Sequence, residues 1–126
     1  MAKKINVRKI QTDDREVIVF VDDQLLLVNK KVEPEGRMLA DSDHLSFLYI
    51  LNVEEDFIYV NFPKNVWADL NIALQNKLPI FLQIDIDTRV PLILFHEELE
   101  YFIGNIRENS NYGESMVQAV SQCFII

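Results

Sequence analysis

The sequence contains a single cysteine, Cys123, and has no long apolar run. A lone cysteine cannot form an intramolecular disulfide, and such usage is typical of a reducing compartment. No apolar stretch reaches the roughly 20 residues that a membrane-spanning helix needs. The basic segment at the N-terminus also lacks the apolar core of a secretory signal. We therefore expect a cytoplasmic protein without a membrane partner.

Glycine and proline are scarce, with three and four residues among 126. With so few residues that interrupt helices and strands, the sequence indicates no flexible linker between domains. The apolar fraction of 49% and the charged fraction of 25% are those of an ordinary globular protein. The length falls within the usual range for one domain. We therefore predict that residues 1–126 form a single domain.

Positive charge is limited, because 12 Lys and Arg stand against 20 Asp and Glu, which gives a net charge of −8. Residues 38–126 carry the whole acidic excess, with four basic residues against thirteen acidic ones. Nucleic-acid binding depends on clustered cations that neutralise phosphates, so we expect no nucleic-acid partner. The one basic cluster is predicted to be a solvated, charged strand edge; it consists of Lys3, Lys4, Arg8 and Lys9.

Signatures of catalytic and cofactor sites are missing as well. The glycines form no phosphate-binding loop, and one cysteine with two histidines makes no zinc site. Asp41 to His44 supplies the residue types of a triad, but four consecutive residues do not converge on one another, so a turn with local hydrogen bonds explains them. Asp85 and Asp87 are assigned to the polar face of a strand. We predict no catalytic residue, no metal site and no cofactor.

The first half of the chain has the pattern of consecutive short strands. Apolar and β-branched runs alternate with short polar turns, and the runs at 17–21 and 25–28 are spaced as a tight hairpin. Strands joined by short turns pair antiparallel, which predicts an antiparallel β-meander. The expected strands cover residues 5–10, 17–21, 25–28, 37–40, 45–51 and 57–62.

The second half is mainly helical. Pro63 opens a helix whose apolar face consists of Val66, Trp67, Leu70, Ala73 and Leu74. Alternation over residues 80–86 predicts a half-exposed strand, and Pro91 places the next strand at a sheet edge. Helices follow at 95–108 and from about 114 on, the second with a capping box of Asn111 and Glu114. The predicted fold is therefore α+β, an antiparallel meander with one intervening helix and two C-terminal helices packed on it.

Two segments and Trp67 resemble the YjbL-like family of small uncharacterised bacterial (Firmicute) proteins. The first segment is Asp41 to Leu51, and the second is Asn105 to Gly113. The chain departs from the family pattern at Glu108, where Gly is more common, and at His44, where Asn is more common. The second departure weakens the idea that His44 is a catalytic base. The resemblance implies a bacterial cytoplasmic setting and supplies no activity.

Two function hypotheses follow. The leading one is a non-enzymatic protein-interaction module, with an unknown protein or a second copy as partner, because Tyr101 and Ile72 fall outside the apolar faces of their helices. This hypothesis places the contact at a sheet edge or at the face near these two residues. The alternative is a small-ligand-binding protein or enzyme with a pocket between two polar turns. Its candidate residues are Asp41, Ser42, Asp43, Asn109, Asn111, Tyr112 and Gly113.

Overall fold

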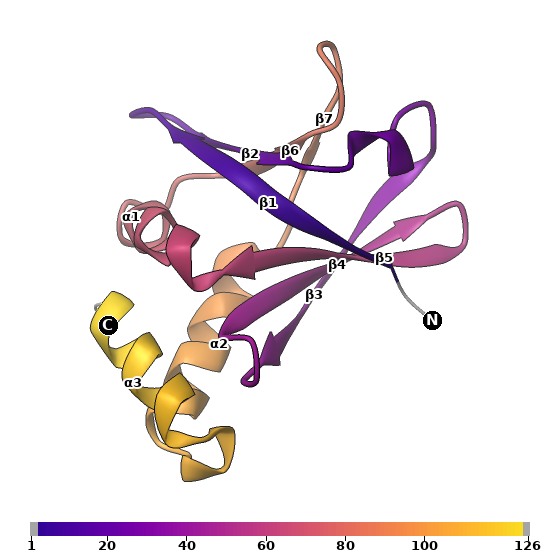
Figure 1. Cartoon of the computed structure of the whole chain (residues 1–126). Coiled ribbons are helices and arrows are strands. Elements are labelled where there is room, and N and C mark those ends of the chain that lie inside the picture. Colours follow the sequence, from indigo (N-terminus) through magenta and orange to yellow (C-terminus); the bar gives the residue numbers. More distant parts are fainter. Residues whose placement is uncertain (1–2, 125–126) are drawn as a thin grey trace.

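The computed structural model describes residues 3–124, apart from the side chain of Ser110. It contains one sheet and three α-helices (Figure 1), so the prediction of an α+β fold is confirmed. The strands are β1 (Lys3–Thr12), β2 (Val17–Val21), β3 (Val32–Asp41), β4 (Ser46–Val53), β5 (Asp56–Pro63), β6 (Ile80–Gln83) and β7 (Arg89–Pro91). The helices are α1 (Trp67–Gln75), α2 (Phe95–Arg107) and α3 (Glu114–Cys123), with 3₁₀ turns η1 (Gln24–Leu26), η2 (Lys64–Val66) and η3 (Ser110–Tyr112).

The seven strands form a mixed sheet in the order β3-β4-β5-β1-β2-β6-β7. Sequence neighbours β3–β4–β5, β1–β2 and β6–β7 pair antiparallel, whereas β1 pairs parallel with β5 and β2 pairs parallel with β6. The prediction of a purely antiparallel meander is therefore wrong. Short turns constrain only strands that follow one another, and both parallel pairs join segments more than 50 residues apart.

The predicted hairpin between residues 17–21 and 25–28 is also wrong in its second strand. The amides of Leu27 and Val28 both donate to the carbonyl of Gln24, at 2.9 and 3.0 Å, so the chain forms the η1 turn there. Leu27 is fully buried while Leu25 is 82% exposed. Residues 25 and 27 would share one face of a strand, so their opposite burial fits a tight turn and not a strand.

The predicted strand at 80–86 ends early, at Gln83. Beyond it the chain turns, because the amide of Ile84 donates to the carbonyl of Thr88 and Asp85 Oδ1 accepts the Asp87 amide at 2.9 Å. Asp85 and Asp87 therefore belong to a turn and not to the polar face of a strand, and Ile86 at its tip is 93% exposed. The strand containing Pro91 lies at the sheet edge, as predicted.

One apolar core joins the sheet to the helices. The apolar face predicted for the first helix, formed by residues of α1 and by Val66 just before it, is buried. Trp67 Nε1 donates to the Phe62 carbonyl at 2.9 Å. The Trp67 ring packs against Phe47 and Phe124, with centroid distances of 5.0 and 5.6 Å. The helix α3 starts at Gly113 without a side-chain cap, so the predicted capping box of Asn111 and Glu114 is wrong.

The sheet curls strongly, because its first strand β3 and its last strand β7 are in contact. The helices gather at one end of this curled sheet, whereas the η1 turn and the β4–β5 hairpin lie at the other end (Figure 1). The two ends therefore differ: three helices cover one, and a short turn and a hairpin border the other.

Candidate functional site

The first predicted polar turn closes on itself. Asp41 Oδ1 accepts the His44 amide at 3.2 Å, and Asp41 Oδ2 lies 2.9 Å from His44 Nδ1 and 3.9 Å from Lys4 Nζ. Partial burial works to raise the pKa of Asp41, but the two hydrogen bonds from His44 outweigh it, so the pKa lies below its ordinary value. Ser42 is half-buried and Asp43 is exposed. The carboxylate of Asp41 thus stabilises the turn between β3 and β4.

The second predicted polar segment also uses its groups locally. Asn109 Oδ1 accepts the Asn111 amide at 3.0 Å, and the Tyr112 amide donates to the Asn109 carbonyl at 3.3 Å. Gly113 has φ +89° and ψ 147° at the start of α3, a region that is essentially restricted to glycine. Tyr112 packs against the core. These residues together shape the connection from α2 to α3.

Among the residues that the structure describes, no hydrogen bond or ion pair joins the first polar turn to the second. A shallow hollow beside the second segment includes Asn109, but its other lining residues come from α2, the residue after α2, and α3; they are Arg107, Glu108, Glu114 and Val117. A shared pocket of the two turns stays a prediction.

Tyr101 and Ile72 are 62% and 47% exposed. The sequence analysis missed two further exposed apolar residues, Ile93 and Leu94, which are 46% and 54% exposed at the start of α2. Leu94 precedes α2 by one residue and lies seven positions before Tyr101, so the two follow one side of the helix. Ile72 belongs to α1, and none of the contacts described for residues 3–124 joins it to Tyr101.

Ile93 and Leu94 lie beside Gly36 of the edge strand β3, and Tyr101 lies two turns further along α2. We call the region of these three residues the α2–β3 seam. A Cβ placed on Gly36, which has φ +68°, would lie only 3.1 Å from Leu94 Cδ1, so the leucine packs closely over the strand. Glu98 Oε1 accepts the Met38 amide of β3 at 3.0 Å. Helix and strand are therefore fixed to one another beneath the exposed side chains.

A buried tyrosine holds the same seam from inside. The Tyr49 hydroxyl donates to the Ile93 carbonyl at 2.7 Å. Desolvation by burial raises the pKa of Tyr49 to about 12, because the charged phenolate is disfavoured away from water. Tyr49 also stacks against Phe95, the first residue of α2, with ring centroids 5.8 Å apart. The backbone of Ile93 is thus anchored to the core while its side chain stays half exposed.

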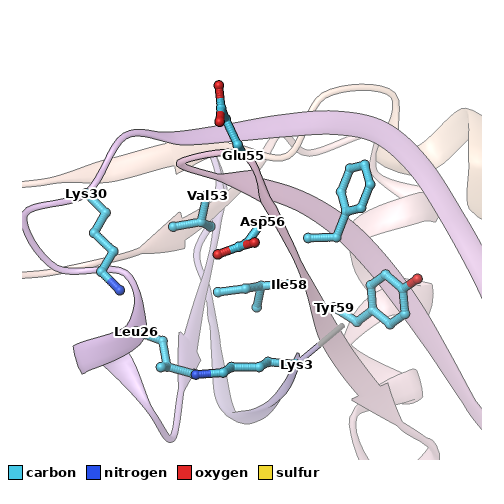
Figure 2. Close-up of a pocket in the computed structure, with 9 residues that line it drawn as sticks. Lys3, Leu26, Lys30, Val53, Glu55, Asp56, Ile58 and Tyr59 are labelled. Atoms are coloured by element: carbon cyan, nitrogen blue, oxygen red, sulfur yellow. The ribbon is translucent and has the colours of Figure 1, made fainter. Parts of the chain in front are cut away.

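A cavity of about 450 Å³ lies at the end of the curled sheet that the helices leave open. Its lining comes from β1, the η1 region and the β4–β5 hairpin. Figure 2 shows Lys3, Lys30 and the Asp56 carboxylate around the same space, with Val53, Ile58 and Leu26 beside them, while the Glu55 carboxylate is directed away. The remaining lining residues are Phe57 and Tyr59.

Sequence reasoning missed this cavity. Lys3 was assigned to a basic strand edge and Leu26 to a strand, while Lys30 was not considered. The available signal was weak, since the lining residues are scattered between positions 3 and 59. Only knowledge of the β1–β5 pairing, which sets Lys3 opposite Ile58, brings them together.

The described residues form neither a metal-binding cluster nor a membrane-spanning helix. Within residues 3–124, His, Cys, Asp and Glu form no group of three or more that could hold a metal ion. In the same part of the chain, no helix has both the length and the apolar character needed to cross a membrane. The cytoplasmic location stays a prediction.

Comparison with known proteins places the sequence among bacterial relatives. The model of a family of unknown function, UPF0738, matches residues 5–124. A UPF0738 protein of a Geobacillus species is 41% identical over 99% of both chains. The UPF0738 protein YjbL of Bacillus subtilis is 41% identical over 82% of this chain and 89% of its own. These matches confirm the resemblance drawn from the segments at 41–51 and 105–113. No solved structure matches the chain.

Proposed function

Because the chain belongs to the UPF0738 family, whose function is unknown, we propose its role from its own surface: it is a non-enzymatic protein-interaction module that forms a homodimer through the α2–β3 seam. The observation that carries the proposal is a set of exposed apolar side chains along one side of α2. Ile93, Leu94 and Tyr101 are 46%, 54% and 62% exposed. Exposed apolar residues that share one side of a helix, unlike scattered ones, mark interaction surfaces.

The rigidity of the seam supports this role. Tyr49 fixes the Ile93 backbone, and Glu98 fixes α2 to β3. Side chains that project from a rigid base lose little conformational entropy when a partner binds. A tyrosine beside aliphatic side chains is also a typical centre of a protein interface.

The contact is proposed to use side chains and not pairing of strand edges. β3 is an edge strand, but Glu98 already accepts the Met38 amide on it. The other edge, β7, has three residues and includes Pro91, which cannot donate a hydrogen bond. Both edges are thereby poor templates for an added strand.

A second copy is the favoured partner because the charges near the seam are self-complementary. Arg37 is exposed on β3, where its guanidinium lies 3.4 Å from the Glu35 carboxylate, whereas Glu97 and Glu100 are exposed on α2. A twofold axis sets the β3 side of one copy opposite the α2 side of the other. Such an axis therefore allows Arg37 to approach the carboxylates of the partner copy.

Size-exclusion chromatography with light scattering tests the proposal, over protein concentrations from about 10 to about 500 μM. We expect the mass of two chains, and we expect Tyr101→Ser to weaken the dimer at least about tenfold, equivalent to about 1.4 kcal/mol. The matched control is Ile72→Ser, which removes a comparably exposed apolar side chain from α1 and should leave the dimer intact. A single-chain mass at every concentration, or equal effects of the two substitutions, contradicts the proposal.

The alternative function, a ligand pocket built from the Asp41 and Asn111 turns, has weaker support. In each turn a side-chain oxygen, of Asp41 and of Asn109, accepts a backbone amide of the same turn. Local turn hydrogen bonds account for both segments without a ligand.

A further inference from the structure

The cavity at the open end of the curled sheet has the position and size of a ligand site. Mouths of curled β-sheets and volumes of roughly 300 to 1,000 Å³ are common among small-molecule sites, and this cavity measures about 450 Å³. It lies away from the helices (Figure 1). It is therefore a surface separate from the α2–β3 seam.

The floor of the cavity is apolar and belongs to the core. Val53 and Ile58 are only 3% and 4% exposed, and Leu26 packs against the same core from the η1 turn. Phe57, 45% exposed, and Tyr59 add aromatic surface at the side. Such a lining favours the apolar body of a ligand, because burying that body removes apolar surface from water.

The charges of the cavity favour an anion. Among residues 3–124, no carboxylate lies within ion-pair distance of the ammonium of Lys3 or of Lys30. Asp56 is the one carboxylate that Figure 2 shows directed into the space, since Glu55 is directed away. The lining as a whole is balanced, with Lys3 and Lys30 against Glu55 and Asp56. The local excess of positive charge within the space depends on the outward direction of the Glu55 carboxylate.

We propose that this cavity binds a small amphiphilic anion, a molecule with an apolar body and a carboxylate or phosphate head group. The body lies on Val53, Ile58 and Leu26, and the head group accepts hydrogen bonds from Lys3 and Lys30. Charge-assisted hydrogen bonds of this kind are stronger than neutral ones, and at a partly desolvated site they fix the orientation of the ligand.

A fluorescence titration with 1-anilinonaphthalene-8-sulfonate tests the proposal, because this probe combines an apolar body with an anionic head and becomes fluorescent when bound. Its uncharged counterpart, N-phenyl-1-naphthylamine, separates the contribution of the head group. We expect Lys3→Gln and Lys30→Gln each to weaken binding of the anionic probe by roughly tenfold or more, the usual size of one charged hydrogen bond. Binding of the neutral probe should change less than about twofold.

Two further variants make the result specific. Asp56→Asn should tighten binding of the anionic probe several-fold, since it removes a repulsive charge, and a merely damaged fold would not give this sign. Lys64→Gln, at an exposed lysine of η2 outside the cavity, should leave binding unchanged. Near-ultraviolet circular dichroism of each variant verifies native packing, because partly folded states also bind the probe.

Displacement of the probe by octanoate or by octyl phosphate then identifies the head group. Displacement by one of them, or by both, supports the proposal and shows whether carboxylate, phosphate or either is accepted. Failure of both compounds to displace the probe, no probe binding to the folded protein, or equal binding by the wild type and both lysine variants overturns it.

Discussion

Tyr49 connects the core to the surface that we propose as an interface. Its ring is buried and its hydroxyl bonds to the Ile93 carbonyl. The 3.6-residue periodicity of the apolar residues predicted the buried helix faces correctly, including Trp67, because the burial of a helix face follows from spacing alone. The same periodicity placed Tyr101 and Ile72 outside these faces. It did not identify Ile93 and Leu94, since they follow Pro91 in an irregular segment where no period applies.

The Tyr49→Phe substitution should lower the free energy of unfolding by about 1 to 2 kcal/mol at pH 8, because it leaves the buried Ile93 carbonyl without its donor. The folded pKa is about 12 against an ordinary value of 10.0. Between pH 10 and 12 the native state therefore keeps the phenolic proton that the unfolded state loses. The contribution of Tyr49 to the free energy of unfolding is complete below pH 10 and decreases between pH 10 and 12.

Urea unfolding of both proteins at pH 8 and pH 11.5 measures this effect. The advantage of the wild type over Tyr49→Phe should shrink by about 1 to 2 kcal/mol at the higher pH. Tyr101→Phe, which removes an exposed hydroxyl, is the control. A stability difference that stays the same at both pH values would contradict the role given to Tyr49.

At the scale of elements, the sequence pattern predicted which helices and strands exist better than it predicted where they begin and end. The helix at 95–108 matches α2, and the 45–51 and 57–62 strands match β4 and β5. The strand proposed at 25–28 is a turn, and so is the end of the strand proposed at 80–86, beyond Gln83. A short apolar run does not distinguish a strand from a turn that buries one of its residues. The hairpin between β4 and β5 shows another departure from local preference, since Glu54 and Glu55 both have positive φ, 50° and 75°.

Glu55→Gly should raise the free energy of unfolding by about 1 kcal/mol, because glycine adopts positive φ without the steric cost that Glu bears. The matched substitution Glu100→Gly, at an exposed position inside α2, should lower it by about 1 kcal/mol. Chemical denaturation measures both changes. A loss of stability in Glu55→Gly would show that the hairpin gains from the glutamate something that its backbone geometry does not reveal.

At the scale of the whole molecule, the sequence predicted the fold class but not the order of the strands. The parallel pairs β1–β5 and β2–β6 join segments distant in the sequence, and their choice depends on which apolar faces meet in the core. The cavity depends on the first of these pairs, β1–β5, which brings Lys3 opposite Ile58 of the β4–β5 hairpin. The net charge of −8, by contrast, is read directly from the sequence and bears on assembly, because two such chains repel one another.

This repulsion gives the homodimer a characteristic salt dependence. Surface charges are screened beyond about 8 to 10 Å at ordinary ionic strength, and over shorter distances in concentrated salt. Added salt screens both the repulsion between two chains of net charge −8 and the attraction of Arg37 for the carboxylates of the partner copy. The repulsion is the larger of the two, because it involves the whole charge of each chain, while the apolar contact of Ile93, Leu94 and Tyr101 persists. The dimer should become tighter as the salt concentration rises.

Sedimentation equilibrium of the wild-type protein at about 50 mM and about 500 mM salt tests the central claim most directly. The account predicts the mass of two chains, with a dissociation constant several-fold lower at the higher salt concentration. The mass of a single chain at both salt concentrations, up to about 500 μM protein, would contradict it.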